Sequence, residues 1–259
     1  MQRRATRRSV LGGLSACLAA PAALATAAGW ERLPAVAALL AGVEPRRGGL
    51  VLDLPLLTED GSAVGVTVRA DSPMTAADHI VTLHLFATRN PSPEVAVFHL
   101  TPQLGRAELS TRIRLNESQT VVAVARTSTG EVRVAAQEVT VTTTGCLVPA
   151  DPGMTAAMQE PRVRVGSGRP AEVRTLIDHP METGLRLDAQ GRPVAERIVR
   201  EISASAGETL LLRAELFRSV AANPYLRFFT AVDPPVELRV TWVEDTGARV
   251  SATAQLPAA

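Results

Sequence analysis

The sequence contains no lysine, so arginine supplies every one of its 27 Lys or Arg residues. This absence excludes chemistry that needs a lysine amine, such as a Schiff base. Aromatic residues are only 3% of the 259 residues, so the core must be built from Val, Leu, Ile and Ala. There are four unclustered histidines and two cysteines, and no phosphate loop or haem-attachment motif. We therefore expect no metal site, no cofactor and no enzymatic acid–base constellation.

The charge of the chain is nearly balanced. The net charge is +1, and four arginines lie within the first eight residues, so the chain without them has a charge of −3. Such a chain has no polybasic footprint for nucleic acid. With 46% apolar and 20% charged residues, the composition is typical of a soluble globular protein.

The N-terminus, residues 1–27, predicts a secretory signal of the twin-arginine type. A stretch containing Arg7-Arg8 precedes an apolar run that ends at the small-residue site Ala25-Thr26-Ala27. The apolar run is too short and too rich in glycine for a transmembrane span. We therefore expect a periplasmic protein. The alternative is a lipoprotein, because Leu14-Ser15-Ala16-Cys17 resembles a lipobox in which Cys17 would carry the lipid.

The rest of the chain predicts an all-β fold with one short helix. Residues 30–42 have helical spacing, so residues 28–49 are expected to form a helix and a connector. From residue 50 onward, apolar and polar residues alternate in short runs that are separated by Gly, Pro, Asn and Asp turns. The pattern stops near Pro149 and resumes at residue 162. This predicts two antiparallel β-sandwiches at 50–146 and 160–259, joined by a linker at 147–159.

Cys146 lies where the first sandwich runs out into Thr144-Gly145. Cleavage of the signal removes Cys17, so the exported chain keeps Cys146 alone, without a cysteine to pair with. One interpretation is a buried cysteine that acts as a small apolar residue. The other is a reactive thiol, which is favoured by the flexibility that Gly145 gives and by the proline-containing connector after Cys146, since connectors run over the surface.

At this point the chain resembles a known family. Residues 50–146 resemble SoxY and residues 160–255 resemble SoxZ, the two subunits of the periplasmic sulfur-oxidation (thiosulfate) carrier. The matching stretches of the first half are Asp71-Ser72-Pro73-Met74-Thr75, Arg89-Asn90-Pro91-Ser92-Pro93, Thr111-Arg112-Ile113-Arg114-Leu115 and Gly145-Cys146. Those of the second half are Pro161–Val165, Thr175–Gly184 with the run HPMETG, and Ala221–Phe229 with the run ANPYLRFF.

The resemblance implies a non-enzymatic carrier made of two immunoglobulin-like sandwiches that pack on each other. It implies that Cys146 attaches the sulfur-containing group covalently and that Gly145 keeps the arm flexible. The implied partners are a c-type cytochrome that loads the thiol and a hydrolase that releases sulfate. His179, within HPMETG, is expected to shape the contact between the halves, and Arg162, Arg164 and Arg174 to form a solvated sheet face.

The motif around the cysteine departs from the family. The family places its cysteine in Gly-Gly-Cys-Gly-Gly at a free C-terminus, whereas here Leu147-Val148 follow Cys146 and the chain continues into the second half. This fused arrangement resembles the SoxYZ-like carriers associated with quinoprotein dehydrogenases. The alternative function is therefore a docking or assembly module of such a dehydrogenase system, in which the cysteine is dispensable.

Overall fold

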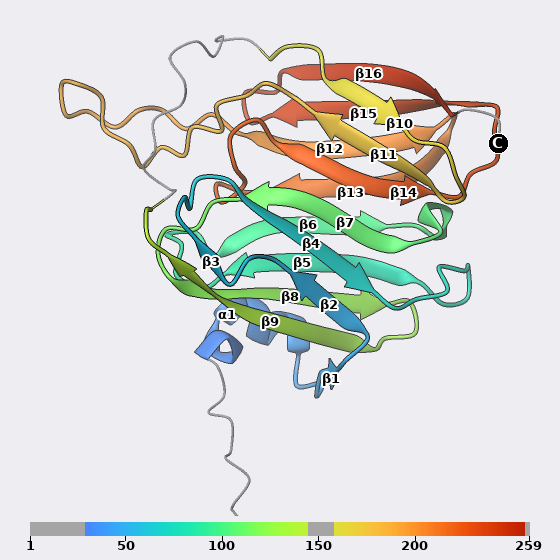
Figure 1. The fold of residues 1–259 in the computed structure, drawn as a ribbon, viewed down its shortest axis with the longest axis horizontal. Coiled ribbons are helices and arrows are strands. Elements are labelled where there is room, and N and C mark those ends of the chain that lie inside the picture. The colour runs from blue at the N-terminus through green and yellow to red at the C-terminus, as the bar shows by residue number, and fades with distance from the viewer. Residues whose placement is uncertain (1–28, 145–157, 257–259) are drawn as a thin grey trace, which may run out of the picture.

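The computed structural model describes residues 29–144 and 158–256, which form two β-sheets stacked face to face (Figure 1). The predicted all-β class with one short helix is confirmed. The N-terminal segment consists of η1 (Gly29–Arg32) and α1 (Pro34–Leu40). Pro34 stands in the first turn of α1, where its missing N–H costs nothing, and the helix ends at Ala41 in a left-handed conformation. Among the described residues, no helix has the length and apolarity to cross a membrane.

Strands such as those at Leu50–Asp53 and Val64–Ala70 alternate buried and less buried side chains, as the sequence pattern predicted. Those of the first half are β1 (Arg46–Arg47), β2 (Leu50–Asp53), β3 (Leu57–Thr58), β4 (Val64–Ala70), β5 (Ile80–Ala87), β6 (Glu94–Leu100), β7 (Ala107–Ile113), β8 (Gln119–Thr127) and β9 (Val132–Val141), with η2 (Pro102–Leu104) between β6 and β7. Those of the second half are β10 (Arg162–Val165), β11 (Ala171–Leu176), β12 (Val199–Ala206), β13 (Thr209–Leu216), β14 (Tyr225–Thr230), β15 (Val236–Glu244) and β16 (Arg249–Leu256).

Both sheets run through both halves of the chain. The larger sheet has ten strands in the order β1-β9-β8-β5-β6-β13-β12-β15-β16, with β3 added to β9. The smaller sheet has six strands in the order β10-β11-β14-β7-β4-β2. The halves therefore meet twice, where β6 pairs with β13 and where β7 pairs with β14 (Figure 1).

At this junction, strands of the two halves pair directly with each other, which is a closer association than a contact between two finished sandwiches. Leu100 lies opposite Leu212 in the β6–β13 ladder, and Arg227 lies opposite Ser110 between β14 and β7. The edge strands β6 and β7 of the first half pair with β13 and β14 of the second half. Without this pairing their edges would be exposed, and exposed strand edges promote association with other chains. The two halves pack on each other, as expected, but through shared sheets and not through an apolar strip between finished domains. The domain boundaries drawn from the sequence stay a prediction.

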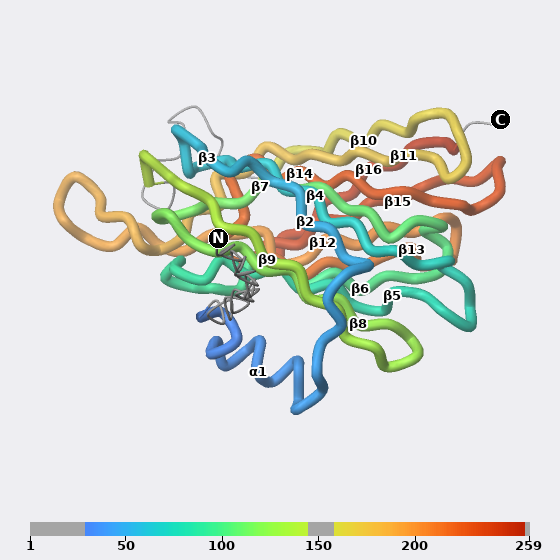
Figure 2. Tube along the Cα trace, turned by 60° about the horizontal axis from the view of Figure 1, so that its bottom comes forward, coloured from blue at the N-terminus to red at the C-terminus, as the bar shows by residue number. Residues whose placement is uncertain are grey.

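One apolar core fills the space between the sheets and includes residues of both halves, among them Leu85, Phe98, Leu212 and Trp242. Strand β8 is buried on both faces because the helical segment lies on its outer side (Figure 2). There, Trp30 and Val36 pack with Val122 and Val124 in a second cluster. The short helix thus covers a part of the large sheet that would otherwise expose apolar side chains.

Candidate functional site at the junction of the two halves

The predicted attachment residue Cys146 lies outside the described residues, as do Gly145 and Cys17. The structure does describe the chain up to Thr144 and from Met158 onward. It therefore defines the base from which the segment with Cys146 departs, together with the polar network around this base.

The base of this segment is held by hydrogen bonds on both sides. The Thr142 N–H donates to the Thr58 carbonyl at 3.1 Å, and the Gly61 N–H donates to the Thr143 carbonyl at 2.9 Å. The Thr144 hydroxyl then donates to Asn116 Oδ1 at 2.9 Å. Strand β9 ends at Val141, and the residues after it are held by the parallel strand β3 and the 116–118 turn, partners that the local sequence does not reveal.

Asn90 is the hub that connects this base to the second half. It is 5% exposed and uses all of its hydrogen-bonding capacity. Its Nδ2 donates to the Arg114 carbonyl at 2.8 Å and to Ser219 Oγ at 2.9 Å. Its Oδ1 accepts from the Asn116 N–H at 2.9 Å and from Gln119 Nε2 at 2.8 Å. Through Asn116 and Asn90, the last described residue before Cys146 is thus linked to Ser219 of the second half.

Two arginines of the Thr111–Leu115 motif bind backbone carbonyls of the second half. Arg114 Nη1 donates to the Met181 carbonyl at 2.6 Å and Nη2 to the Pro180 carbonyl at 3.2 Å. Arg112 Nη2 donates to the Asn223 carbonyl at 2.8 Å. The guanidinium can do this because it carries five donors in a fixed planar arrangement. Three of the motifs that carry the family resemblance therefore meet at one place.

His179 holds the carbonyl that Arg114 binds. Its Nδ1 accepts a hydrogen bond from the Met181 N–H at 3.0 Å, so Nε2 carries the proton that is donated to Glu244 Oε1 at 2.8 Å. The Asn223 N–H donates to the His179 carbonyl at 2.8 Å, and the His179 N–H donates to Asn223 Oδ1 at 3.0 Å. Met181 and Asn223 both have positive φ, at 48° and 51°. His179 thus fixes a turn that faces the first half, which agrees with the role that was expected for it.

The electrostatics keep His179 neutral. Burial lowers the pKa of His179 below its ordinary value, and this outweighs the attraction of Glu244. Burial acts to raise the pKa of Glu244, but hydrogen bonds from Thr246 and His179 and the charge of Arg197 hold it below its usual range. The pair is 1% and 2% exposed. The imidazole is therefore neutral, fixed in one tautomer and buried. It has a structural role and does not donate a proton to a ligand.

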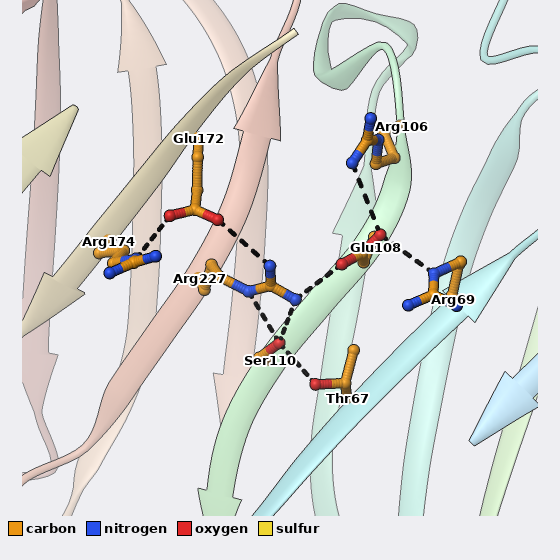
Figure 3. A network of polar contacts seen from close by, with 8 residues as sticks. All are labelled: Thr67, Arg69, Arg106, Glu108, Ser110, Glu172, Arg174 and Arg227. Atoms are coloured by element: carbon orange, nitrogen blue, oxygen red, sulfur yellow. Dashed lines mark hydrogen bonds and ion pairs between the residues drawn. The ribbon is translucent and has the colours of Figure 1, made fainter. Parts of the chain in front are cut away.

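A second polar network joins the halves on the outer face of the smaller sheet (Figure 3). Arg227 of β14 donates to Glu108 at 2.7 Å and to Ser110 at 2.8 Å, both on β7, and its other nitrogen reaches Glu172 of β11 at 3.2 Å. Ser110 also shares a hydrogen bond with Thr67 at 2.8 Å. Arg227 therefore ties strands of both halves together across the seam of the sheet.

Sequence reasoning missed the roles of Asn90, Arg112, Arg114 and Asn116. The first three lie in motifs that carry the family resemblance, so the sequence marked them as notable. The local sequence does not reveal which atoms they bind, because their partners are distant along the chain. No group of three or more His, Cys, Asp and Glu that could hold a metal occurs within residues 29–144 and 158–256.

Comparison with protein-family models assigns both halves. Residues 36–146 match the sulfur oxidation protein SoxY, and residues 158–255 match the sulphur oxidation protein SoxZ. The two matches follow one another and together cover most of the chain. Cys146 is the last residue of the SoxY match. A search of curated proteins found no match.

Several solved structures resemble part of the chain. The sulfur carrier protein SoxY from Chlorobium limicola f thiosulfatophilum is 28% identical over 41% of this chain and 92% of its own, with a TM-score of 0.35. The superoxide reductase (neelaredoxin) from Ignicoccus hospitalis is 16% identical over 42% and 92%, with a TM-score of 0.33. A putative superoxide reductase from Thermotoga maritima is 20% identical over 38% and 87%, with a TM-score of 0.32. At these TM-scores the likenesses carry no argument about function.

Proposed function

The chain belongs to the SoxY and SoxZ families of sulfur-oxidation proteins, fused in tandem, and on this premise we propose that it carries a sulfur-containing intermediate as a covalent adduct of Cys146. The role is that of a carrier and not of an enzyme. It presents the adduct in turn to the enzymes that load and process it. The observation that carries the proposal is the position of Cys146 at the end of the SoxY match, two residues beyond the anchored Thr144.

The chemistry of loading needs an oxidant. With thiosulfate as cargo, the thiol of Cys146 and the outer sulfur of thiosulfate form an S–S bond, giving Cys–S–S–SO₃⁻, one proton and two electrons. The electrons pass to a partner, which we propose to be a c-type cytochrome. The attacking species is the thiolate, so loading removes the proton of the thiol as well as the two electrons.

The base of the segment limits how Cys146 is presented. Thr144 is bonded to Asn116, and Asn116 through Asn90 to Ser219, which supports the proposal that partners approach the end of the molecule where the two halves meet. In the family the arm is free-ended, whereas here the chain continues past Leu147 and Val148 into the second half. We propose that the fused arm delivers its cargo over a shorter reach, with a hydrolase releasing sulfate from it.

The place of action that we propose is the periplasm. This part rests on the paired arginines and the cleavage site at Ala25–Ala27, and it fits a carrier that is loaded by a c-type cytochrome. Anchoring through Cys17 is the alternative. A mass spectrum of the exported protein distinguishes them, because cleavage after Ala27 leaves residue 28 as the N-terminus whereas a lipoprotein begins at a lipidated Cys17.

The replacement of the family's glycines by Leu147 and Val148 favours one alternative function, a docking module of a quinoprotein dehydrogenase system. The substitution Cys146→Ser separates the two. The carrier proposal predicts that a strain with this variant loses growth on thiosulfate while the exported protein reaches normal levels. The docking alternative predicts undisturbed growth on thiosulfate and on alcohols.

A further inference from the structure

Six arginines cross the outer face of the smaller sheet in a strip that extends over both halves. We call this the arginine strip, and its members are Arg162, Arg164, Arg174, Arg227 and Arg69 on the strands and Arg106 directly before β7. Arg164 lies directly opposite Arg174, and Arg174 directly opposite Arg227, in neighbouring strands. Strands β10, β11, β14, β7 and β4 are adjacent in that order, so with a strand spacing of about 4.8 Å the strip is about 19 Å long.

Folding alone does not account for this arrangement. Like charges that face each other across a ladder are destabilising. Charge on the edge strand β10 protects it from pairing with other chains, which would explain Arg162 and Arg164. It does not explain Arg174, which lies on the interior strand β11, where it pairs with Glu172 at 2.5 Å and still leaves 59% of its side chain exposed. Within the described parts of the chain, no carboxylate lies at ion-pair distance from Arg164.

Two carboxylates that pair with the strip, Glu108 and Glu172, are less exposed than Arg69 and Arg106, whereas a third, Asp178, pairs with Arg162 at 2.7 Å and is 51% exposed. The side chain of Glu108 is 8% exposed and that of Glu172 is 25% exposed, whereas those of Arg69 and Arg106 are 49% and 48% exposed. Figure 3 shows Glu172 between Arg174 and Arg227, and Glu108 among Arg227, Arg106 and Arg69. The two glutamates therefore hold guanidinium groups in place from below. The six arginines outnumber the three carboxylates that pair with them, Glu108, Glu172 and Asp178, so the strip is net positive.

The strip has two hollows with different linings. One, of about 390 Å³, is lined by Arg162, Arg164 and Arg174 together with Leu176 and Tyr225. The other, of about 710 Å³, lies between Arg69 and Arg106 at the far end of the strip. Arginine and tyrosine beside an apolar floor are the residues that dominate protein–protein contacts. A surface about 19 Å long with two hollows exceeds what one small oxyanion occupies.

We propose that the arginine strip is the docking surface for a partner protein that presents a row of carboxylates. The rest of the molecule supports this, because the chain without its N-terminal arginines has a net charge of −3, so the strip is a local positive surface on an anionic protein. Such a surface steers an acidic partner and sets its orientation. The proposal does not depend on what Cys146 carries.

The test uses the exported chain with Cys146→Ser, so that thiol chemistry plays no part. The probe is a fluorescent ten-residue peptide of alternating Glu and Ser, and the control peptide has Gln in place of Glu. We expect the Glu peptide alone to bind in 20 mM salt and to weaken markedly in 200 mM salt. The double variant Arg164→Gln/Arg174→Gln should weaken binding about tenfold, since two charge-assisted contacts are lost. The matched control Arg239→Gln, on strand β15 of the larger sheet, should leave it unchanged.

The proposal is overturned if the Glu peptide does not bind in 20 mM salt or if it binds the double variant as well as the parent. It is also overturned if sulfate at equal ionic strength binds the strip more tightly than the peptide does, which would indicate a small-anion site. Binding to vesicles with 30% phosphatidylglycerol, together with no binding to the peptide, would indicate a membrane surface instead. Thermal unfolding of each variant shows whether the fold is retained.

Discussion

The Nη1 atom of Arg114 in the first half lies 2.6 Å from the carbonyl oxygen of Met181 in the second half, and the N–H of the same Met181 donates to His179 Nδ1. One residue is thus held from both sides of the junction. The guanidinium is buried, with Arg114 5% exposed, so the contact is made away from bulk water. This pair shows how two families that match successive parts of the chain become one structural unit.

Replacing Arg114 with methionine should destabilise the fold. The change keeps apolar bulk but leaves the carbonyls of Met181 and Pro180 without their donor, and a buried unsatisfied group costs about 1–3 kcal/mol. We expect the free energy of unfolding in urea to fall by about 2–4 kcal/mol. The surface control Arg239→Met should change it by less than about 0.5 kcal/mol. An equal effect of both substitutions would contradict the role given to Arg114.

The two halves should unfold together, because both sheets and the core run through them. The chain offers one tryptophan in each half, Trp30 and Trp242, and both are buried. In the variants Trp242→Phe and Trp30→Phe, fluorescence reports on a single half while far-UV circular dichroism reports on both. Within each variant the two signals should give the same urea midpoint. Separate midpoints would show that the halves fold as independent domains.

Asn90 should contribute more to the stability of the fold than the size of its side chain suggests. The substitution Asn90→Ala removes the partners of the Arg114 carbonyl, Ser219 Oγ, the Asn116 N–H and Gln119 Nε2 at once. We expect a loss of about 2–3 kcal/mol in the free energy of unfolding. Hydrogen exchange should also speed up at the Asn116 amide, which loses its acceptor. Unchanged exchange there would contradict the link between Asn90 and the base of the segment that leads to Cys146.

Stability should fall as the pH decreases from about 6.5 to 4, and His84 should contribute to this. Burial, with repulsion from His99 and Arg126, lowers the pKa of His84 from 6.5 to about 4, although Glu215 acts in the opposite direction. The unfolded chain therefore binds more protons than the folded chain in this window, so acidification favours unfolding. For this one group the loss is about 3 kcal/mol at 1.36 kcal/mol per unit. The variant His84→Gln should show a shallower decline, and an unchanged slope would contradict the assignment.

The sequence predicted local structure well and long-range structure poorly. Alternation at Val64, Val66 and Val68 predicted a half-buried strand, and the helical spacing near Pro34 predicted the helix, because both patterns are local. The two-residue strands β1 and β3 are too short to show a period. The pairing of β6 with β13 depends on residues more than 100 positions apart, and no local pattern encodes such a partner.

In the candidate site, too, local features were predicted from the sequence and long-range contacts were not. Cys146 stood out in the sequence because it is unpaired and follows Gly145. The anchoring of Thr144 by Asn116 did not stand out, since a threonine at the end of a strand has no distinctive pattern. Arg164 and Arg174 were expected to be merely solvated, and their direct opposition became visible only with the register of β10 and β11.

The thiol of Cys146 should be accessible in the native protein. A carrier needs its thiol to enter the active sites of other proteins, so a bulky maleimide should label Cys146 at nearly the rate of a free cysteine peptide. The comparison uses the same protein in denaturant, where the rate is that of the unfolded chain. Labelling that is slow until denaturant is added would mean that Cys146 is a buried structural residue.

The most direct measurement is the intact mass of the exported protein after incubation with thiosulfate and a thiosulfate-oxidising c-type cytochrome, followed by mass analysis of the peptide that contains Cys146. The carrier account predicts one added thiosulfonate group per chain, located on Cys146, removed by a thiol reductant and absent from Cys146→Ser. An unmodified Cys146 under conditions that fully load a two-subunit SoxYZ carrier would contradict the account.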